Sequence, residues 1–114
     1  MTLLQEVDRK RGHKFYPSTT EGIPAIMATE DIATADKIVH LHYFVGGADW
    51  FITELDPETG EAFGWAELLS GCGEWGYVFL PELATLEVGP LVVERDLYWS
   101  PKPVKEVDRI PQRV

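Results

Sequence analysis

Basic residues are scarce in the middle of this 114-residue chain. Between Glu21 and Trp99 only Lys37 and Arg95 are basic, whereas fifteen side chains are acidic. Both flanks have a small basic excess instead, and the formal net charge of the whole chain is −9. An acidic surface repels nucleic acid phosphates and attracts basic partners. The composition therefore argues against direct nucleic acid binding and predicts a basic protein surface as the partner.

Cysteine and long hydrophobic runs are also nearly absent. Cys72 is the only cysteine, which excludes an internal disulfide and a cysteine-rich zinc site. No apolar run approaches the length of a membrane span, and the first residues lack the apolar region of a signal peptide. We therefore expect a cytoplasmic protein with no membrane partner. The length and a hydrophobic content of 45% are typical of one domain with a modest core.

Catalytic motifs are a third absence. The chain has no glycine-rich phosphate loop, no serine nucleophile elbow and no dinucleotide fingerprint. Cys72 stands between two glycines in an acidic region, where a reactive thiolate is disfavoured. We therefore assign no catalytic residue and no cofactor, and we expect a protein that is not an enzyme.

Helix and strand signals are present along most of the chain. Thr2 and Gln5 have the spacing of a capping box for a short helix that ends at Gly12. Strand-like segments separated by Gly and Pro turns span residues 37–44, 50–55, 61–69, 75–79 and 91–99. Pro81 marks the first turn of a second short helix. We expect an α+β fold, with a strongly bent, mainly antiparallel sheet of about five strands and one or two short helices packed on it.

The charge pattern divides the chain into three parts. Residues 1–20 are expected to form a basic N-terminal helix and extension, residues 21–107 the acidic α+β domain, and residues 108–114 a flexible C-terminal tail. The domain contains more aromatic residues than one face of a small sheet can bury. We therefore expect aromatic side chains on the second face to form a contact patch ringed by acids.

Two sets of residues are candidates for function. The first set, expected to contact a basic partner, consists of Glu54, Asp56, Glu58, Glu61, Glu67 and Glu74. The second set, a ligand site or a structural anchor, consists of Glu94, Arg95, Asp96 and Tyr98. Alternation along a strand puts Glu94, Asp96 and Tyr98 on one face, where paired carboxylates beside a tyrosine could perform acid–base chemistry. The favoured interpretation is structural, with Arg95 buried and paired with a carboxylate such as Glu54 or Glu94.

His40 and His42 are the remaining candidates. On a strand both imidazoles face the same side, which suits two ligands of a metal ion. Any two polar residues at this spacing share a face, so we assign no metal site and keep the pair only as the ligands to consider. The favoured interpretation is a polar strand face whose imidazoles hydrogen-bond nearby carboxylates.

Several short motifs match a known family. They are Trp50-Phe51-Ile52-Thr53-Glu54, Phe63-Gly64, Gly76-Tyr77-Val78-Phe79-Leu80, Glu82-Leu83, and Glu94-Arg95-Asp96-Leu97-Tyr98-Trp99 followed by Pro101. Through these motifs residues 23–107 resemble a small bacterial family known as domain of unknown function 2958. The resemblance implies a setting on plasmids, conjugative elements and phages, and it implies no reaction. The chain differs from the family pattern at Trp75, where members usually have leucine, and in the basic stretch up to Thr20.

These observations favour an accessory protein of mobile elements that is not an enzyme and acts by binding another protein. Its acidic face would imitate nucleic acid and inhibit a defence protein, as anti-restriction and anti-CRISPR proteins do. One alternative is a small-molecule or nucleotide-binding, sponge-like domain with a pocket lined by Trp and Tyr and closed by Arg95. A third interpretation is a small enzyme that uses Glu94, Asp96 and Tyr98 or the histidine pair.

Overall fold

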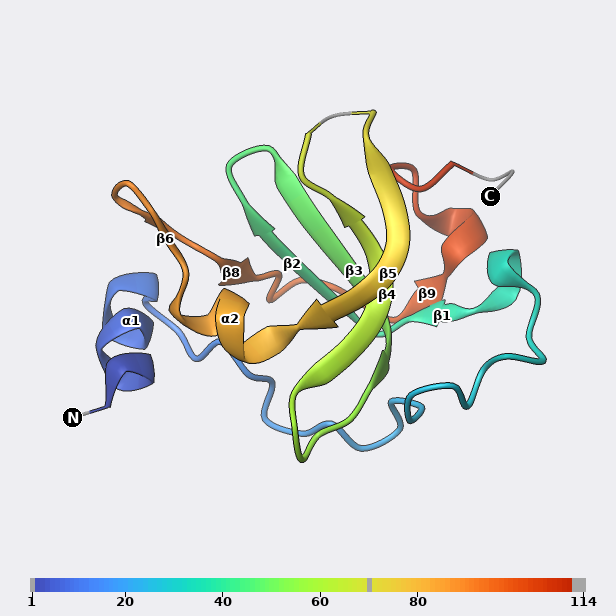
Figure 1. Ribbon diagram of the computed structural model, residues 1–114, viewed down its shortest axis with the longest axis horizontal. Coiled ribbons are helices and arrows are strands. Elements are labelled where there is room, and N and C mark those ends of the chain that lie inside the picture. The colour runs from blue at the N-terminus through green and yellow to red at the C-terminus, as the bar shows by residue number, and fades with distance from the viewer. Residues whose placement is uncertain (1, 70, 112–114) are drawn as a thin grey trace.

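A five-stranded antiparallel sheet forms the centre of the molecule (Figure 1). The computed structural model describes residues 2–69 and 71–111. The strand order is β5-β4-β3-β2-β8, and the respective bounds are Gly73–Phe79, Glu61–Glu67, Ala48–Leu55, Leu41–Val45 and Glu94–Arg95. The predicted α+β class with a bent antiparallel sheet of five strands is confirmed.

Smaller elements flank this sheet at its two ends. The helices are α1 (Leu3–Arg11) and α2 (Leu80–Thr85), and a hairpin joins β6 (Glu87–Val88) to β7 (Leu91–Val92). Strand β1 (Ile38–Val39) pairs with β9 (Lys102–Pro103). The short 3-10 helix η1 (Thr34–Asp36) comes just before β1 in the chain, and η2 (Val104–Glu106) comes directly after β9. Figure 1 shows α1 and the β6–β7 hairpin at one end of the molecule and β1, β9 and η2 at the other. Among the described helices, none has both the length and the apolar character needed to cross a membrane.

Helix α1 begins and ends as its sequence predicts. The Thr2 hydroxyl accepts a hydrogen bond from the Gln5 backbone, and the Gln5 side chain accepts one from the Thr2 backbone, which completes the capping box. Gly12 closes the helix in the left-handed conformation, with φ 84°. Pro81 lies in the first turn of α2, also as predicted.

The predicted strand over residues 91–99 is wrong in its extent. The structure divides this segment into β7 and β8, and β8 ends at Arg95. The Asp96 carboxylate accepts a hydrogen bond from the Tyr98 backbone N–H at 3.0 Å, which stabilises a turn where a longer strand was expected. Glu94, Asp96 and Tyr98 therefore do not alternate along one strand face.

The first face of the sheet carries the larger core. Tyr43, Trp50 and Ile52 are central to it, and α2 contributes Leu80. Phe15 from the N-terminal segment is fully buried there and stacks on Tyr43, with ring centroids 4.4 Å apart. Residues 1–20, which were expected to form an extension, therefore contribute a central side chain to the core.

The C-terminal segment covers part of the second face. Its apolar side chains Val104, Val107 and Ile110 pack with Phe51 and Trp65 in a second core. Ile110 is fully buried. The expected flexible tail of residues 108–114 therefore begins within this core, and only its residues 112–114 lie outside the described part of the chain.

A β-bulge in β3 changes which residues face this second side. The register against β4 shifts between Ile52 and Glu54, so that Glu54 and not Thr53 lies opposite Phe63. The buried Thr53 hydroxyl donates to the Phe63 carbonyl at 3.1 Å. As a result Phe51 and Glu54 face the same side, although regular alternation would separate them.

Candidate functional site

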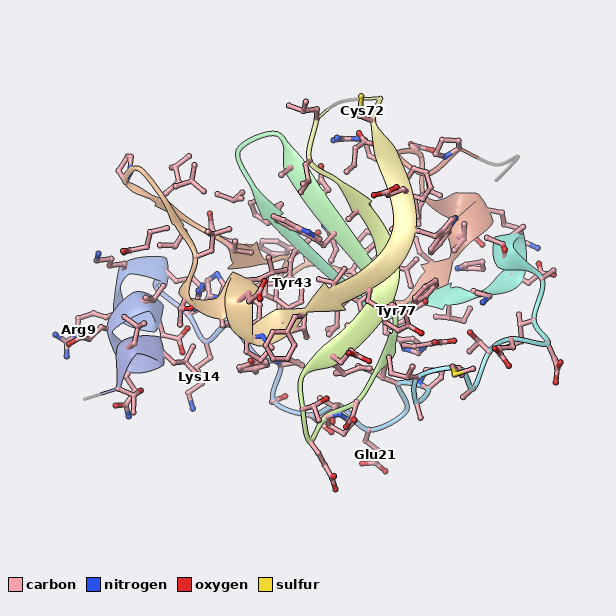
Figure 2. The ribbon with its side chains drawn as sticks, in the orientation of Figure 1. Arg9, Lys14, Glu21, Tyr43, Cys72 and Tyr77 are labelled. Atoms are coloured by element: carbon pink, nitrogen blue, oxygen red, sulfur yellow. The ribbon has the colours of Figure 1, made fainter. Side chains whose placement is uncertain are left out.

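An aromatic row crosses β4 and β5 on the second face of the sheet. It consists of Phe63, Trp75, Tyr77 and Phe79. The Phe63 ring is nearly parallel to Trp75 at 6.3 Å between centroids and meets Tyr77 edge-to-face at 5.4 Å. Tyr77, labelled on β5 in Figure 2, is 62% exposed, and Phe79 is 46% exposed. The structure therefore contains exposed aromatic side chains on the second face, where the sequence predicts a contact patch.

Strand β5, which carries most of this aromatic row, is an edge of the sheet. In the described part of the chain it pairs with β4 alone, over all of its residues. Figure 1 shows no other element in front of it. An edge strand directs alternate N–H and C=O groups outward, where another strand can pair with them. The indole Nε1 of Trp75 adds a buried donor that has no hydrogen-bond partner among the described residues.

Glu54 lies at the border of the aromatic row and is only 3% exposed. Its carboxylate accepts hydrogen bonds from the backbone N–H groups of Met27 at 2.8 Å and Thr29 at 3.2 Å, and from the Thr29 hydroxyl. Burial alone would raise the pKa of the Glu54 carboxyl, but these hydrogen bonds from Thr29 and Met27 hold the pKa below its usual value. Met27 has φ 72°, which is uncommon for a residue other than glycine. Glu54 therefore anchors the loop before η1, and it is not free to contact a partner as predicted.

A small pocket of about 130 Å³ lies beside this loop and reaches the aromatic row. Its walls include Glu30, Lys37 and Glu54 together with the rings of Phe63 and Tyr77. The Glu30 side chain is exposed, so a carboxylate and aromatic rings share one hollow of the surface. Both kinds of group attract a cationic side chain.

Glu67, another of the predicted partner contacts, is also buried and already paired. Its Oε2 accepts hydrogen bonds from Arg109 Nη2 at 2.6 Å and Nε at 3.1 Å. The hydrogen bond from Arg109 lowers the pKa of the Glu67 carboxyl. Arg109 Nη1 also lies 2.9 Å from Asp49 Oδ2. Glu67 and Asp49 therefore fasten the C-terminal segment to the sheet, and Glu67 does not face a partner.

Asp49 links this ion pair to His42. The His42 Nε2 lies 2.7 Å from Asp49 Oδ1, and its Nδ1 lies 2.9 Å from Asp96 Oδ2. The imidazole stacks on Phe51 at 4.6 Å between centroids with an angle of 5° between the planes. The interpretation of His42 as a histidine that hydrogen-bonds nearby carboxylates is confirmed. The network holds strand β2, strand β3 and the turn after β8 together.

His40 is not part of this network. Its backbone N–H donates to the Ile52 carbonyl at 2.8 Å, and burial lowers the pKa of its imidazole. Among residues 2–69 and 71–111, no three His, Cys, Asp or Glu side chains are arranged to hold a metal ion.

The other predicted acids lie at opposite ends of the sheet. Asp56, Glu58 and Glu61 gather at the turn between β3 and β4, where Asp56 accepts a hydrogen bond from the Glu58 backbone at 2.9 Å. Glu74 lies near the start of β5, opposite Ala66 at the far end of β4. Glu58, Glu61 and Glu74 are exposed. The six acids of the predicted partner set therefore do not form one cluster.

Arg95 is half-buried, and its predicted pairing with a carboxylate is wrong. Its Nε donates to the Phe15 carbonyl and its Nη2 to the Lys14 carbonyl, each at 3.2 Å. Its sequence neighbour Glu94 is part-exposed and lies 3.7 Å from His13 Nε2. Tyr98 is 96% exposed. The second predicted set is thus distributed over different environments, and the structure does not bring it together as an acid–base site.

Arg11 is the arginine that is buried among residues 2–69 and 71–111, and the sequence gives no strong signal for it. Its Nε donates to the Val93 carbonyl and its Nη2 to the Ala84 carbonyl, each at 2.6 Å, and it forms an ion pair with Asp8. The side chain has no exposed surface. Arg11 therefore joins α1 to α2 and to the strand region before β8.

Sequence comparison relates the central part of this structure to known proteins. A family model described as "Protein of unknown function (DUF2958)" matches residues 24–106. The matched range includes the aromatic row, Glu54 and His42, but neither Arg11 nor Arg109. No curated protein and no solved structure matches the chain.

Proposed function

We propose that this chain, which belongs to the DUF2958 family, binds another protein at the free edge of its sheet. The observation that carries the proposal is the aromatic row on the edge strand β5. Exposed rings beside unpaired backbone groups provide both apolar area and main-chain hydrogen bonds to an incoming chain. No catalytic role is part of the proposal.

The partner that fits this edge is an extended, basic segment. An added strand would pair with β5 through its backbone and place alternate side chains over the rings of Tyr77 and Phe79. Arg or Lys side chains gain most there, because aromatic faces attract cations and Glu30 and Glu61 are exposed acids beside the row. Lys37 is the one base in the neighbouring pocket wall.

A bacterial defence protein whose basic surface holds nucleic acid is the class of partner that this charge fits best. Plasmids and phages, the setting that the resemblance implies, meet restriction and CRISPR proteins inside the cell. The exposed acids Glu58 and Glu61, which lie together at the turn between β3 and β4, would imitate phosphates, because Glu54 and Glu67 are bonded within the protein and Glu74 lies at the far end of the sheet. We place the protein with such a partner in the cytoplasm.

A synthetic extended peptide of alternating Arg and Val tests the edge. We expect it to shift the backbone amide NMR signals of β5 and to bind about tenfold more weakly to Tyr77→Ala, since one cation–π contact is lost. Tyr98→Ala is the matched control, because Tyr98 is also an exposed tyrosine but lies in the turn after β8. Equal binding by both variants, or shifts that miss β5, would refute the proposed site.

Inhibition of purified restriction and CRISPR nucleases tests the partner class. We expect the wild type to inhibit at least one such enzyme, and Glu58→Gln combined with Glu61→Gln to inhibit less without a change in melting temperature. The chain itself should give no gel shift with duplex DNA, because its body lacks clustered bases. If the wild type inhibits none of these enzymes, a defence protein is rejected as the partner. The peptide experiment would still decide whether β5 is a protein-binding edge.

A further inference from the structure

A second surface site lies between α1, residues 14–18 and strand β8. It is a pocket of about 630 Å³, within the range of pockets that bind small molecules. Its polar lining includes Lys14, Arg95, Asp8 and Tyr16. We propose that this pocket binds a small organic phosphate that carries a planar ring, with a nucleoside monophosphate as the representative ligand.

Arg95 is held in place for this role by backbone groups. A guanidinium has five N–H donors, and Arg95 uses one each from Nε and Nη2 on the carbonyls of Phe15 and Lys14. The Phe15 carbonyl is itself fixed, because it also accepts the hydroxyl of the buried Tyr43 at 3.1 Å. The other N–H groups have no acceptor among the described residues. A planar guanidinium with free donors is suited to two-point recognition of a phosphate.

The charges of the lining favour an anion, although the protein as a whole is acidic. Lys14 is exposed, and its ammonium has no ion-pair partner in the described part of the chain. Asp8 brings a negative charge to the same pocket, but its carboxylate pairs with Arg11 and accepts the Phe15 backbone N–H at 3.0 Å. Arg95 and Lys14 are therefore two cations without a carboxylate of their own, which suits a doubly charged phosphate better than a carboxylate.

The remaining walls suit an apolar ring. Leu4 and Pro17 line the pocket beside Tyr16, and Tyr16 is held edge-to-face against Phe15 with centroids 5.0 Å apart. The Tyr16 hydroxyl, like any tyrosine hydroxyl, is protonated at neutral pH and is a hydrogen-bond donor there, and burial raises its pKa further. A flat ring can stack on such a wall while its phosphate reaches the two cations.

This site is independent of the protein-binding edge. The pocket beside the aromatic row and this pocket share no lining residue. Figure 2 shows Lys14 near the end of α1 and Tyr77 on β5, in different parts of the molecule. One site can therefore fail its test without affecting the other.

Titration calorimetry on the full chain tests the proposal with three probes: adenosine 5′-monophosphate, adenosine and inorganic phosphate. We expect the monophosphate to bind best, since only it engages both the ring wall and the cations. Lys14→Gln should weaken that binding about tenfold, as expected for the loss of one charge-assisted hydrogen bond. Lys105→Gln is the matched control, an exposed lysine on η2 that pairs with Asp36.

Arg95→Gln should weaken binding more than Lys14→Gln does. Because Arg95 also ties down the 14–15 backbone, Lys14→Gln and Tyr16→Ala provide the decision if Arg95→Gln does not fold. No binding of the monophosphate at millimolar concentration, equal binding of adenosine, or equal affinity in Lys14→Gln and Lys105→Gln would each overturn the proposal.

Discussion

Replacing Glu54 with glutamine tests whether this carboxylate anchors the loop that borders the aromatic row. The carboxylate accepts hydrogen bonds from two backbone N–H groups and from one hydroxyl, and it is 3% exposed. Glutamine has one side-chain oxygen, so it can keep the bond to Met27 but must turn its NH₂ group toward the donors of Thr29. Two donors would then face each other in a buried place.

The expected cost follows from these bonds. A hydrogen bond to a charged group contributes about 1.5–3 kcal/mol, and a buried donor without an acceptor costs about 1–3 kcal/mol. We therefore expect Glu54→Gln to lower the free energy of unfolding by about 2–4 kcal/mol. That is a large part of the total of about 5–15 kcal/mol that is typical of a small domain.

Urea unfolding followed by tryptophan fluorescence measures the loss, and hydrogen exchange at the amides of Met27 and Thr29 localises it. Glu58→Gln is the control, because Glu58 is exposed at the turn that follows the same strand, and we expect a change below about 0.5 kcal/mol. If Glu54→Gln unfolds at the same urea concentration as the control, the carboxylate does not anchor the loop and is available to a partner.

Three further substitutions test the packing around the sheet. Arg11→Met should lower the free energy of unfolding by about 3–5 kcal/mol in urea, because it leaves the Asp8 carboxylate without its cation and removes the donors to the Val93 and Ala84 carbonyls. The pKa of the Glu67 carboxyl is lower in the folded state than in the unfolded state. Its contribution to the free energy of unfolding is therefore complete above the unfolded pKa and is lost as the pH falls through the folded pKa. In thermal melts from about pH 6 to about pH 3, the melting temperature of Glu67→Gln should therefore fall less than that of wild type. Gly64→Ala should cost about 3 kcal/mol or more in thermal melts, since a Cβ there would lie 1.9 Å from a backbone oxygen of the adjacent strand β3; a melting curve like wild type would contradict that close approach.

The sequence predicts the fold best where short-range patterns decide it. Alternating aromatic and β-branched residues and the turns between them identify β2 to β5, and the capping box at Thr2 identifies α1. The prediction fails after Arg95, because the Asp96 carboxylate accepts the hydrogen bond of the Tyr98 backbone N–H. In a longer strand that N–H would have been available to a neighbouring strand. Val104, Val107 and Ile110 repeat at intervals of three, a signal by which the covering C-terminal segment could have been found.

The site residues are harder to predict because their partners are far away in the sequence or belong to the backbone. Glu54 binds a loop 25 or more residues earlier, and Arg95 binds carbonyl groups about 80 residues earlier. Carbonyl and N–H groups are present at nearly every position and carry no residue-specific signal. Exposure is also the usual state of a glutamate, so burial of Glu54 and Glu67 contradicts the default expectation. His42 is the exception, since the expectation that it bonds carboxylates required no knowledge of which ones.

The position of Ile110 in the second core affects how the protein can be synthesised. A ribosome makes a chain from its N-terminal toward its C-terminal end, so Phe51 and Trp65 emerge long before Val107 and Ile110 can cover them. Until then the nascent sheet exposes one aromatic face to chaperones and proteases. A message that stops before Ile110 would yield a chain that contains the whole sheet but lacks part of its second core. Native packing of Phe51 and Trp65 therefore waits until the chain has been made at least as far as Ile110.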